Sequence, residues 1–258
     1  MGYETIICQE QDGIGTITLN RPERRNALSL MLIEEMMEAL GEIVAHDDLR
    51  AVVITGGAKC FSAGADLRDI LQAPSSTFIA ELRDLLGKIE NFDWPVIAAI
   101  NGHCIGGGCL MAMCCDLRVA ADDATFGFPE IRFGSLVYGG ATQKLTRMIG
   151  LGKAKEMLYT GDPIDSREAY RLGLLNKVVP PESVVDEAKR MARALTQRPP
   201  AALKMMKLLV DTGMGTDPNT LAALEDQLSK MVYASGEAFR EGMKKAAERE
   251  DVYKRIID

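Results

Sequence analysis

Two apolar runs that each end in a glycine-rich loop constrain the fold of this chain more than any other feature. The runs AVVITG (51–56) and PVIAAI (95–100) carry no charge, as is typical of strands buried on both faces of a parallel sheet. Each is followed by a glycine-rich loop and a helix, and strands that alternate with helices predict an α/β fold with right-handed crossovers. Ligands in such folds bind at the carboxyl ends of the strands, where these loops lie.

Other segments extend this pattern. Short apolar runs at Thr5–Cys8 and Ile14–Leu19, separated by a turn, predict a hairpin. Apolar residues recur at helical spacing over Leu30–Ala45, and Leu117–Ala121 and 178–179 predict further strands. We therefore expect the α/β core to continue well past the second glycine loop.

The last part of the chain is helical. From about Ser183 one helical segment follows another, and we place a boundary between a core of residues 1–197 and a tail of residues 198–258. Apolar tail residues such as Met205 and Leu209 need a surface to pack on. They either form a core of their own or contact another copy of the chain, and both can hold together.

Composition narrows the class of function. A formal net charge of −7 and dispersed lysines and arginines argue against nucleic acid as a partner. No apolar window is long enough to cross a membrane, and the start of the chain does not resemble a secretory signal. We expect a cytoplasmic enzyme with neither a nucleic acid nor a membrane partner.

Cysteine and histidine spacing gives no metal motif. The six cysteines include no CxxC pair, which favours buried, reduced thiols. The two histidines, His46 and His103, lie in neither an HExxH nor an HxxxH arrangement. We therefore expect no metal site.

The two glycine loops match no phosphate-binding motif. Neither GGAKCFSAGAD (56–66) nor NGHCIGGGCL (101–110) has P-loop or dinucleotide spacing. Bare backbone at a helix start can instead offer N–H groups to a developing oxyanion, because no side chain blocks the approach. Tight turns for close packing are the alternative for either loop alone, and two such loops in one chain favour the oxyanion site.

Four ordered motifs resemble those of the crotonase superfamily, the enoyl-CoA hydratases and isomerases. They are NRPERRNALS (20–29), FSAGADL (61–67), GHCIGGGC (102–109) and FGFPEIRFG (126–134). The resemblance implies a spiral of ββα repeats with a C-terminal helical trimerisation region. It also implies an acyl-CoA thioester as substrate, with coenzyme A as part of that substrate and no separate cofactor. The expected assembly is a homotrimer or a dimer of trimers.

The resemblance also assigns site residues. The backbone N–H groups of Ala65 and Gly107 are the implied oxyanion donors, and Glu130 is the implied general acid and base. The implied substrate-binding residues are Arg24, Arg25, Ala27, Ala63, Asp66, Leu67, Leu110 and Tyr138.

Several of these residues have simpler explanations. The arginines can be solvated surface residues, and Asp66 can cap a helix beginning at about Leu67. Tyr138 can pack against or shape the pocket, because an ordinary tyrosine titrates near pH 10. The family's usual contacts to coenzyme A in the last helix are poorly matched in MKKAAEREDVYKR (243–255).

One departure from the family pattern bears on the chemistry. Hydratases of this family usually have two glutamates, and this chain has Glu130 but carries Leu110 at the other position. One carboxylate can move a proton from C2 to C4, whereas water addition is easier with two. Isomerisation of a 3-enoyl-CoA is therefore slightly favoured over hydration of a 2-enoyl-CoA. Decarboxylation and a non-catalytic binding role are weaker alternatives.

Leu110 also predicts a dry site. With an apolar neighbour, burial should raise the pKa of Glu130 and make it a better base at neutral pH. The alternative is an ordinary exposed acid in a loop.

Overall fold

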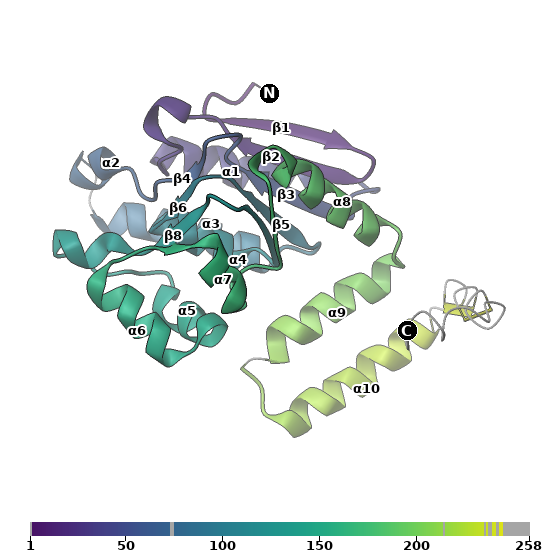
Figure 1. Ribbon diagram of the computed structural model, residues 1–258. Helices are drawn as coiled ribbons and strands as arrows, with labels where there is room; N and C mark the ends of the chain where they lie inside the picture. The colour runs from purple at the N-terminus through teal and green to yellow at the C-terminus, as the bar shows by residue number, and fades with distance from the viewer. Residues whose placement is uncertain are drawn as a thin grey trace. The chain divides into compact units, whose positions relative to one another are not determined.

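The computed structural model describes residues 2–72, 75–213, 215–234, 236, 239–240 and 243–244 (Figure 1). The chain divides into two compact units, Met1–Thr196 and Gln197–Asp258. This division lies one residue from the boundary that the sequence suggested.

A six-stranded sheet forms the centre of the first unit. Its strands, in order across the sheet, are β1 (Ile6–Gln11), β2 (Ile14–Leu19), β3 (Ala51–Thr55), β5 (Val96–Ile100), β7 (Leu117–Ala121) and β10 (Lys177–Val179). The hairpin of β1 and β2 is antiparallel and every other pair is parallel. All residues of β3 and β5 are buried, which explains their uninterrupted apolar sequences.

A second sheet has four short strands. They are β4 (Cys60–Ser62), β6 (His103–Ile105), β8 (Thr125–Gly127) and β9 (Ile164–Asp165), paired in that order. The chain enters this sheet each time it leaves β3, β5 and β7, which produces the expected spiral of ββα turns. The segments that we treated as glycine-rich loops therefore contain the strands β4 and β6, and this part of the prediction was wrong.

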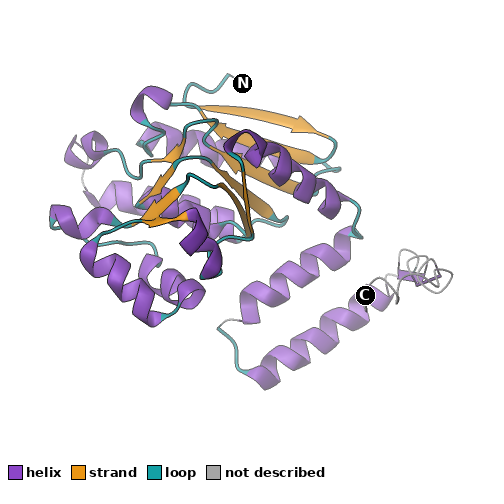
Figure 2. Cartoon of the chain, in the orientation of Figure 1, coloured by secondary structure: helices purple, strands orange, loops and turns teal. Residues whose placement is uncertain are grey.

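Helices surround the two sheets of this unit (Figure 2). The α-helices are α1 (Leu30–Ile43), α2 (Leu67–Gln72), α3 (Ser75–Glu90), α4 (Gly107–Cys114), α5 (Ala141–Ile149), α6 (Leu151–Thr160), α7 (Ser166–Arg171) and α8 (Val184–Thr196). Short 3-10 helices are η1 (Pro22–Arg24), η2 (Pro129–Phe133) and η3 (Pro181–Ser183). Helix α8 covers β3, β5 and β7, while α4 contacts β4 and β6 (Figure 1). In the part of the chain that the structure describes, no helix is long and apolar enough to cross a membrane.

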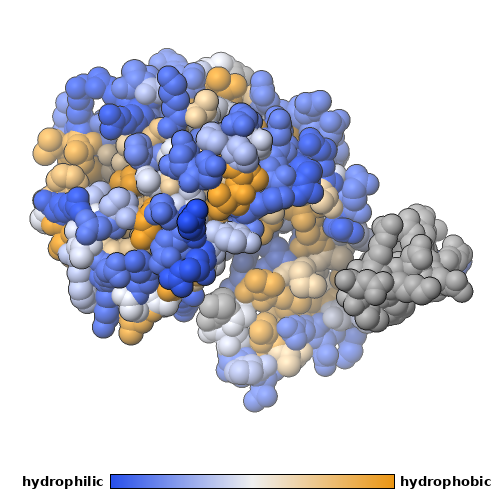
Figure 3. All heavy atoms as spheres, in the orientation of Figure 1, coloured by the Kyte–Doolittle hydropathy of each residue, from blue (hydrophilic) through white to orange (hydrophobic). Residues whose placement is uncertain are grey.

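The second unit contains two helices that pack on each other, α9 (Pro200–Gly213) and α10 (Pro218–Ala234). Several of their apolar side chains are exposed, and Met206 and Val210 each expose more than 60% of their surface. Figure 3 shows hydrophobic surface on this unit. The expected final helix and its coenzyme A contacts lie outside the described residues, apart from a few positions.

Candidate active site

The three glycines at the start of α4 differ in their surroundings. Gly106 precedes the helix with φ of 52° and ψ of −124°, which side-chain-bearing residues rarely adopt. A Cβ at Gly108 would lie 2.6 Å from the Cβ of Ser62, so this glycine lets α4 pack directly on β4. Gly107 is the first residue of α4, where backbone N–H groups have no partner within the helix. The helix dipole adds partial positive charge at the same point.

Ala65 presents its backbone N–H in a direction set by its neighbours. Leu28 N donates to Gly64 O at 2.8 Å, and Asp66 N donates to Leu28 O at 2.9 Å. In this parallel bridge the two residues that flank Ala65 bond to Leu28. The N–H of Ala65 therefore points away from Leu28.

The two glycine-rich segments meet at these donors. A Cβ at Gly64 would lie 3.4 Å from Gly107 N, and one at Gly107 would lie 3.6 Å from Ala65 N. Among the described residues, neither Ala65 N nor Gly107 N donates to a protein oxygen. Two unused N–H groups therefore lie on adjoining backbone segments, as an oxyanion site requires.

Glu130 lies beside the start of α4. It is the second residue of η2 and is only partly exposed, and its Oε2 is buried with no hydrogen-bond partner among the described residues. Its Oε1 lies close to Gly106, because a Cβ at that glycine would be 2.7 Å from this oxygen. Burial raises the pKa of the Glu130 carboxyl, as the sequence predicted, and this result contradicts the alternative of an ordinary exposed acid.

Leu110 forms an apolar wall of this region. It is 2% exposed, and its Cδ2 would lie 2.9 Å from a Cβ at Gly139. Gly139 has φ of +64°, so both its conformation and its packing favour glycine. Leu110 and the segment that carries Tyr138 are therefore in close contact.

Tyr138 is partly buried near Glu130. Burial and, to a smaller extent, the negative charge of Glu130 raise the pKa of Tyr138 to about 12. The phenol therefore stays protonated at neutral pH, which agrees with a shaping role and disfavours a role as a base.

The loop at residues 20–29 is organised by contacts that sequence reasoning missed. Arg21 Nη2 pairs with Asp66 Oδ2 at 3.0 Å, and the buried Asn26 donates through Nδ2 to Gly56 O and Cys60 O, each at 2.8 Å. Asp66 Oδ1 also accepts from Arg68 N at 3.1 Å, which confirms that Asp66 caps α2. These partners lie far apart in the sequence, so only the fold reveals the network.

The remaining predicted binding residues lie around the same loop. Arg24 and Arg25 are exposed and Ala27 is partly exposed, while Leu67 begins α2 with its side chain 61% exposed. Arg25 and Ala63 line a hollow of about 250 Å³ together with His103 and Ile105. Arg25 gives this hollow a cationic residue, which suits a negatively charged group. The substrate-binding roles themselves stay predictions.

His103 and the cysteines show no nucleophilic arrangement. His103 Nδ1 lies 2.8 Å from Thr125 Oγ1, on the neighbouring strand of the small sheet. Five of the six cysteines are buried and Cys8 is partly buried, and all six are free thiols, as expected.

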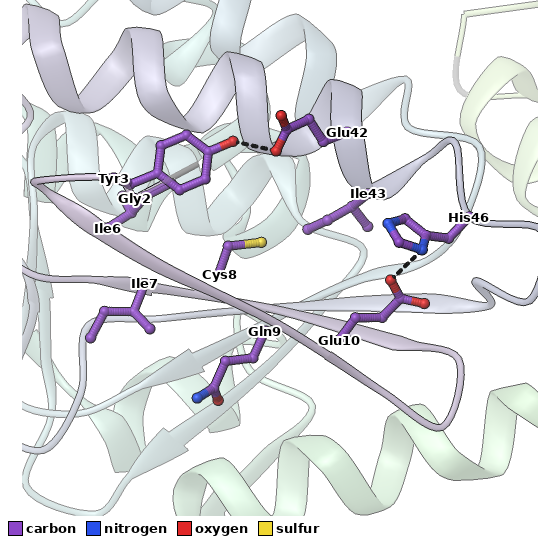
Figure 4. Close-up of a pocket in the computed structure, with 10 residues that line it drawn as sticks. All are labelled: Gly2, Tyr3, Ile6, Ile7, Cys8, Gln9, Glu10, Glu42, Ile43 and His46. Carbon is purple, nitrogen blue, oxygen red and sulfur yellow. Dashed lines mark hydrogen bonds and ion pairs between the residues drawn. The ribbon is translucent and has the colours of Figure 1, made fainter.

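A separate cavity lies between β1 and the end of α1 (Figure 4). It has a volume of about 440 Å³ and contains none of the predicted site residues. His46 Nδ1 lies 2.7 Å from Glu10 Oε2 at its edge. Together with Asp48 these side chains could hold a cation, since one potential ligand atom from each lies within 4.8 Å of the others. Two of the three side chains are exposed, and exposed groups of this kind are common without an ion.

Comparison with known proteins decides the family. The sequence model described as "Enoyl-CoA hydratase/isomerase" matches residues 9–255. The chain belongs to the enoyl-CoA hydratase/isomerase family.

Relatives within this family match along most of their length. A probable enoyl-CoA hydratase of Mycobacterium tuberculosis is 38% identical over 244 residues, which cover 94% of this chain and 95% of the relative. A crotonyl-CoA hydratase of Syntrophomonas wolfei is 37% identical over 247 residues, with 94% and 95% covered. The crystal structure of an enoyl-CoA hydratase from Bacillus anthracis superimposes with a TM-score of 0.90 at 32% identity, covering 95% of this chain and 97% of that one.

Family membership confirms the crotonase-type fold and an enzymatic role. The ββα spiral that was expected from sequence is the fold of the first unit. An enoyl-CoA hydratase/isomerase acts on acyl-CoA thioesters, and the oxyanion role of the two N–H donors stays a prediction.

Proposed function

We propose that this enoyl-CoA hydratase/isomerase hydrates short 2-enoyl-CoA thioesters such as crotonyl-CoA. One observation carries the proposal: the Glu130 carboxylate, with its raised pKa, lies directly beside the helix start that bears Gly107. The names of the relatives support water addition rather than double-bond migration. They therefore favour hydration over the isomerisation that Leu110 suggested.

The proposed reaction uses one carboxylate twice. Glu130 accepts a proton from a water molecule while the water oxygen bonds to C3 of the enoyl group. The negative charge moves to the thioester oxygen, which Ala65 N and Gly107 N stabilise by hydrogen bonds. Glu130 then returns the proton to C2, so a hydroxyl at C3 and a hydrogen at C2 account for one water molecule. A pKa raised by burial suits both the acceptance and the return of the proton.

Isomerisation is the second candidate, and Leu110 is the observation that favours it. Leu110 is buried where a second acid would help hold the water. Glu130 alone can remove a proton from C2 of a 3-enoyl-CoA and return it at C4. The same two N–H donors would stabilise the dienolate that forms in between.

A product assay separates the two candidates. The purified protein is mixed in parallel with crotonyl-CoA and with a 3-enoyl-CoA, and the products are resolved by chromatography and mass spectrometry. Hydration predicts a gain of 18 Da from crotonyl-CoA, the mass of one water, whereas isomerisation predicts a change of retention at constant mass from the 3-enoyl-CoA. Absence of hydroxy product from crotonyl-CoA would contradict the main proposal.

The variant Leu110→Glu tests whether the residue at position 110 determines the choice between hydration and isomerisation. If Leu110 disfavours water, the glutamate should raise the ratio of hydration to isomerisation. Leu110→Met keeps the site apolar and similar in volume, so it serves as the matched control and should leave the ratio unchanged. An unchanged ratio in Leu110→Glu, with the fold intact, would show that this position does not select the reaction.

We further propose that the chain forms a homotrimer or a dimer of trimers through residues 198–258. The exposed apolar side chains of α9 and α10 support this proposal, because exposed apolar surface on a small helical unit is typical of an interaction site.

A further inference from the structure

A buried arginine caps the end of α4 that lies opposite Gly107. Arg118, the second residue of β7, is 7% exposed. Its Nη1 donates to Cys115 O at 2.5 Å and to Ala112 O at 3.3 Å, and its Nη2 donates to Asp116 O at 3.4 Å. The last carbonyl groups of a helix have no partner within it, and Arg118 donates to such groups at the end of α4.

The same side chain joins the end of α4 to the segment that precedes β10, the strand at one edge of the large sheet. Arg118 Nε donates to Leu174 O at 2.7 Å. The backbone of Arg118 is bound in both directions by Asn176, whose Oδ1 accepts from Arg118 N at 2.8 Å and whose N donates to Arg118 O at 2.9 Å. Leu174 and Asn176 lead into β10, which pairs with β7. The end of α4 is therefore fixed to two strands by one residue.

Because it buries a charge, this helix cap is less favourable in free energy than an ordinary one. Burial lowers the pKa of Arg118, because the charged form loses its hydration. The four guanidinium acceptors are backbone carbonyl oxygens, and two of them, Ala112 O and Cys115 O, lie at the end of α4. The negative charge of Asp116 also favours the charged form of Arg118. A glycine cap would satisfy the carbonyl groups without burying a charge.

The short length of α4 links its two ends. The helix has eight residues, all of them buried, so its ends are about 12 Å apart. The helix has two turns and no exposed face. We therefore expect a displacement of Cys115 to be transmitted to Gly107. A cation fixed at the last carbonyl groups of the helix also stabilises negative charge at the opposite end, and Asp116 offsets part of this effect.

We propose that Arg118 is a positioning residue of the oxyanion site, which fixes α4 so that Gly107 N points at the thioester oxygen and places a positive charge behind the helix. The proposal rests on the function proposed above, since it concerns the same N–H donor. Arg118 touches no substrate and acts only through α4.

Two substitutions separate geometry from charge. Arg118→Lys keeps the positive charge and loses the planar set of donors, whereas Arg118→Met keeps an apolar stem and loses both. Arg171→Met is the matched control, because Arg171 lies in the last turn of α7 with its side chain 67% exposed. Circular dichroism and active-site titration give the folded fraction of each variant.

The measurements are kcat and KM for crotonyl-CoA and the near-ultraviolet absorbance of bound cinnamoyl-CoA. Hydrogen bonds to the thioester oxygen polarise this conjugated probe and shift its absorbance to longer wavelength. Per folded enzyme, Arg118→Met should lower kcat by roughly 10- to 100-fold, less than the loss of a whole donor. Its KM should change little and its absorbance shift should shrink, with Arg118→Lys intermediate in both.

Two outcomes would overturn the inference. In the first, folded Arg118 variants keep the wild-type kcat and absorbance shift, or lose activity only in proportion to the folded fraction, while the wild type is active. Arg118 would then be a structural residue only. In the second, the wild type itself neither converts an enoyl-CoA nor shifts the probe, and the proposed function fails together with the role of Arg118.

Discussion

At the scale of single residues, Glu130 combines a functional position with an electrostatic cost. Its Oε2 is buried and receives no hydrogen bond, and burial raises the pKa of the carboxyl above 4.5. The folded state therefore holds the proton more tightly than the unfolded state does. The contribution to stability is complete below the unfolded pKa and is lost as pH rises through the folded pKa.

This linkage predicts that Glu130→Gln is more stable than the wild type at neutral pH. The substitution removes the buried charge, and we expect an increase in Tm of about 2–4 °C at pH 7, since the partial exposure of the side chain limits the effect. The difference in Tm between the variant and the wild type should decrease towards pH 4, where the wild-type carboxyl is also neutral. Thermal unfolding at both pH values measures it. A Tm below the wild type at pH 7 would contradict the electrostatic account.

Gly106 should be the least replaceable glycine beside Glu130. Gly106→Ala places a Cβ 2.7 Å from Glu130 Oε1 at φ of +52°, so the carboxylate must move. We expect a loss of kcat of about 100-fold, since general acid and base catalysis depends on this placement. Gly87→Ala, in the interior of α3 with open space around it, is the control. It should keep full activity and gain about 1 kcal/mol in stability.

Sequence reasoning reached some residues of this site and missed others. Glu130, Leu110 and the middle glycine could be identified because local motifs contain them. Asn26 and Arg118 could not, because their partners lie 30 and 56 residues away in sequence, at Gly56 and Leu174. A polar residue whose partner is distant in sequence looks like an ordinary surface residue until the fold is known.

At the scale of elements, the close packing of α4 on β4 determines how the two N–H donors meet. Gly108→Ala would place a Cβ 2.6 Å from Ser62 Cβ and 2.8 Å from Ser62 O, so helix and strand must separate. We expect a loss of about 1–3 kcal/mol in the free energy of unfolding, with a lower kcat in the fraction that stays folded.

Chemical denaturation and steady-state kinetics test this prediction. Gly152→Ala is the control within a helix, because no atom lies within 4 Å of the Cβ position. Its stability should not fall. Equal behaviour of the two alanine variants would show that the contact between α4 and β4 is unimportant.

The strands differed in how well the sequence predicted them. In the large sheet, β3 and β5 are runs of five buried residues and were predicted from their apolar character. β4 and β6 have three residues each and lie among glycines. Three residues are too few to show a hydrophobic period, so the second sheet could not be predicted from periodicity alone.

At the scale of the whole molecule, the second unit predicts self-association. Met206 and Val210 are one helical turn apart on α9 and are more than 60% exposed. We expect size-exclusion chromatography with light scattering to give a mass of three or six chains, each of 28.1 kDa. The double substitution of Met206 and Val210 by glutamate should lower the mass. A wild-type mass of one chain at micromolar concentration would contradict this prediction.

In the proposed reaction, Glu130 moves a proton on an acyl-CoA held by Ala65 N and Gly107 N. The most direct test compares the wild type and Glu130→Gln with crotonyl-CoA in D₂O, with Glu156→Gln on the surface of α6 as the control. We predict a 3-hydroxyacyl-CoA with one deuterium at C2 from the wild type and the control, and a rate lower by about 10²- to 10⁴-fold in Glu130→Gln. Hydration at the wild-type rate by folded Glu130→Gln would contradict the account.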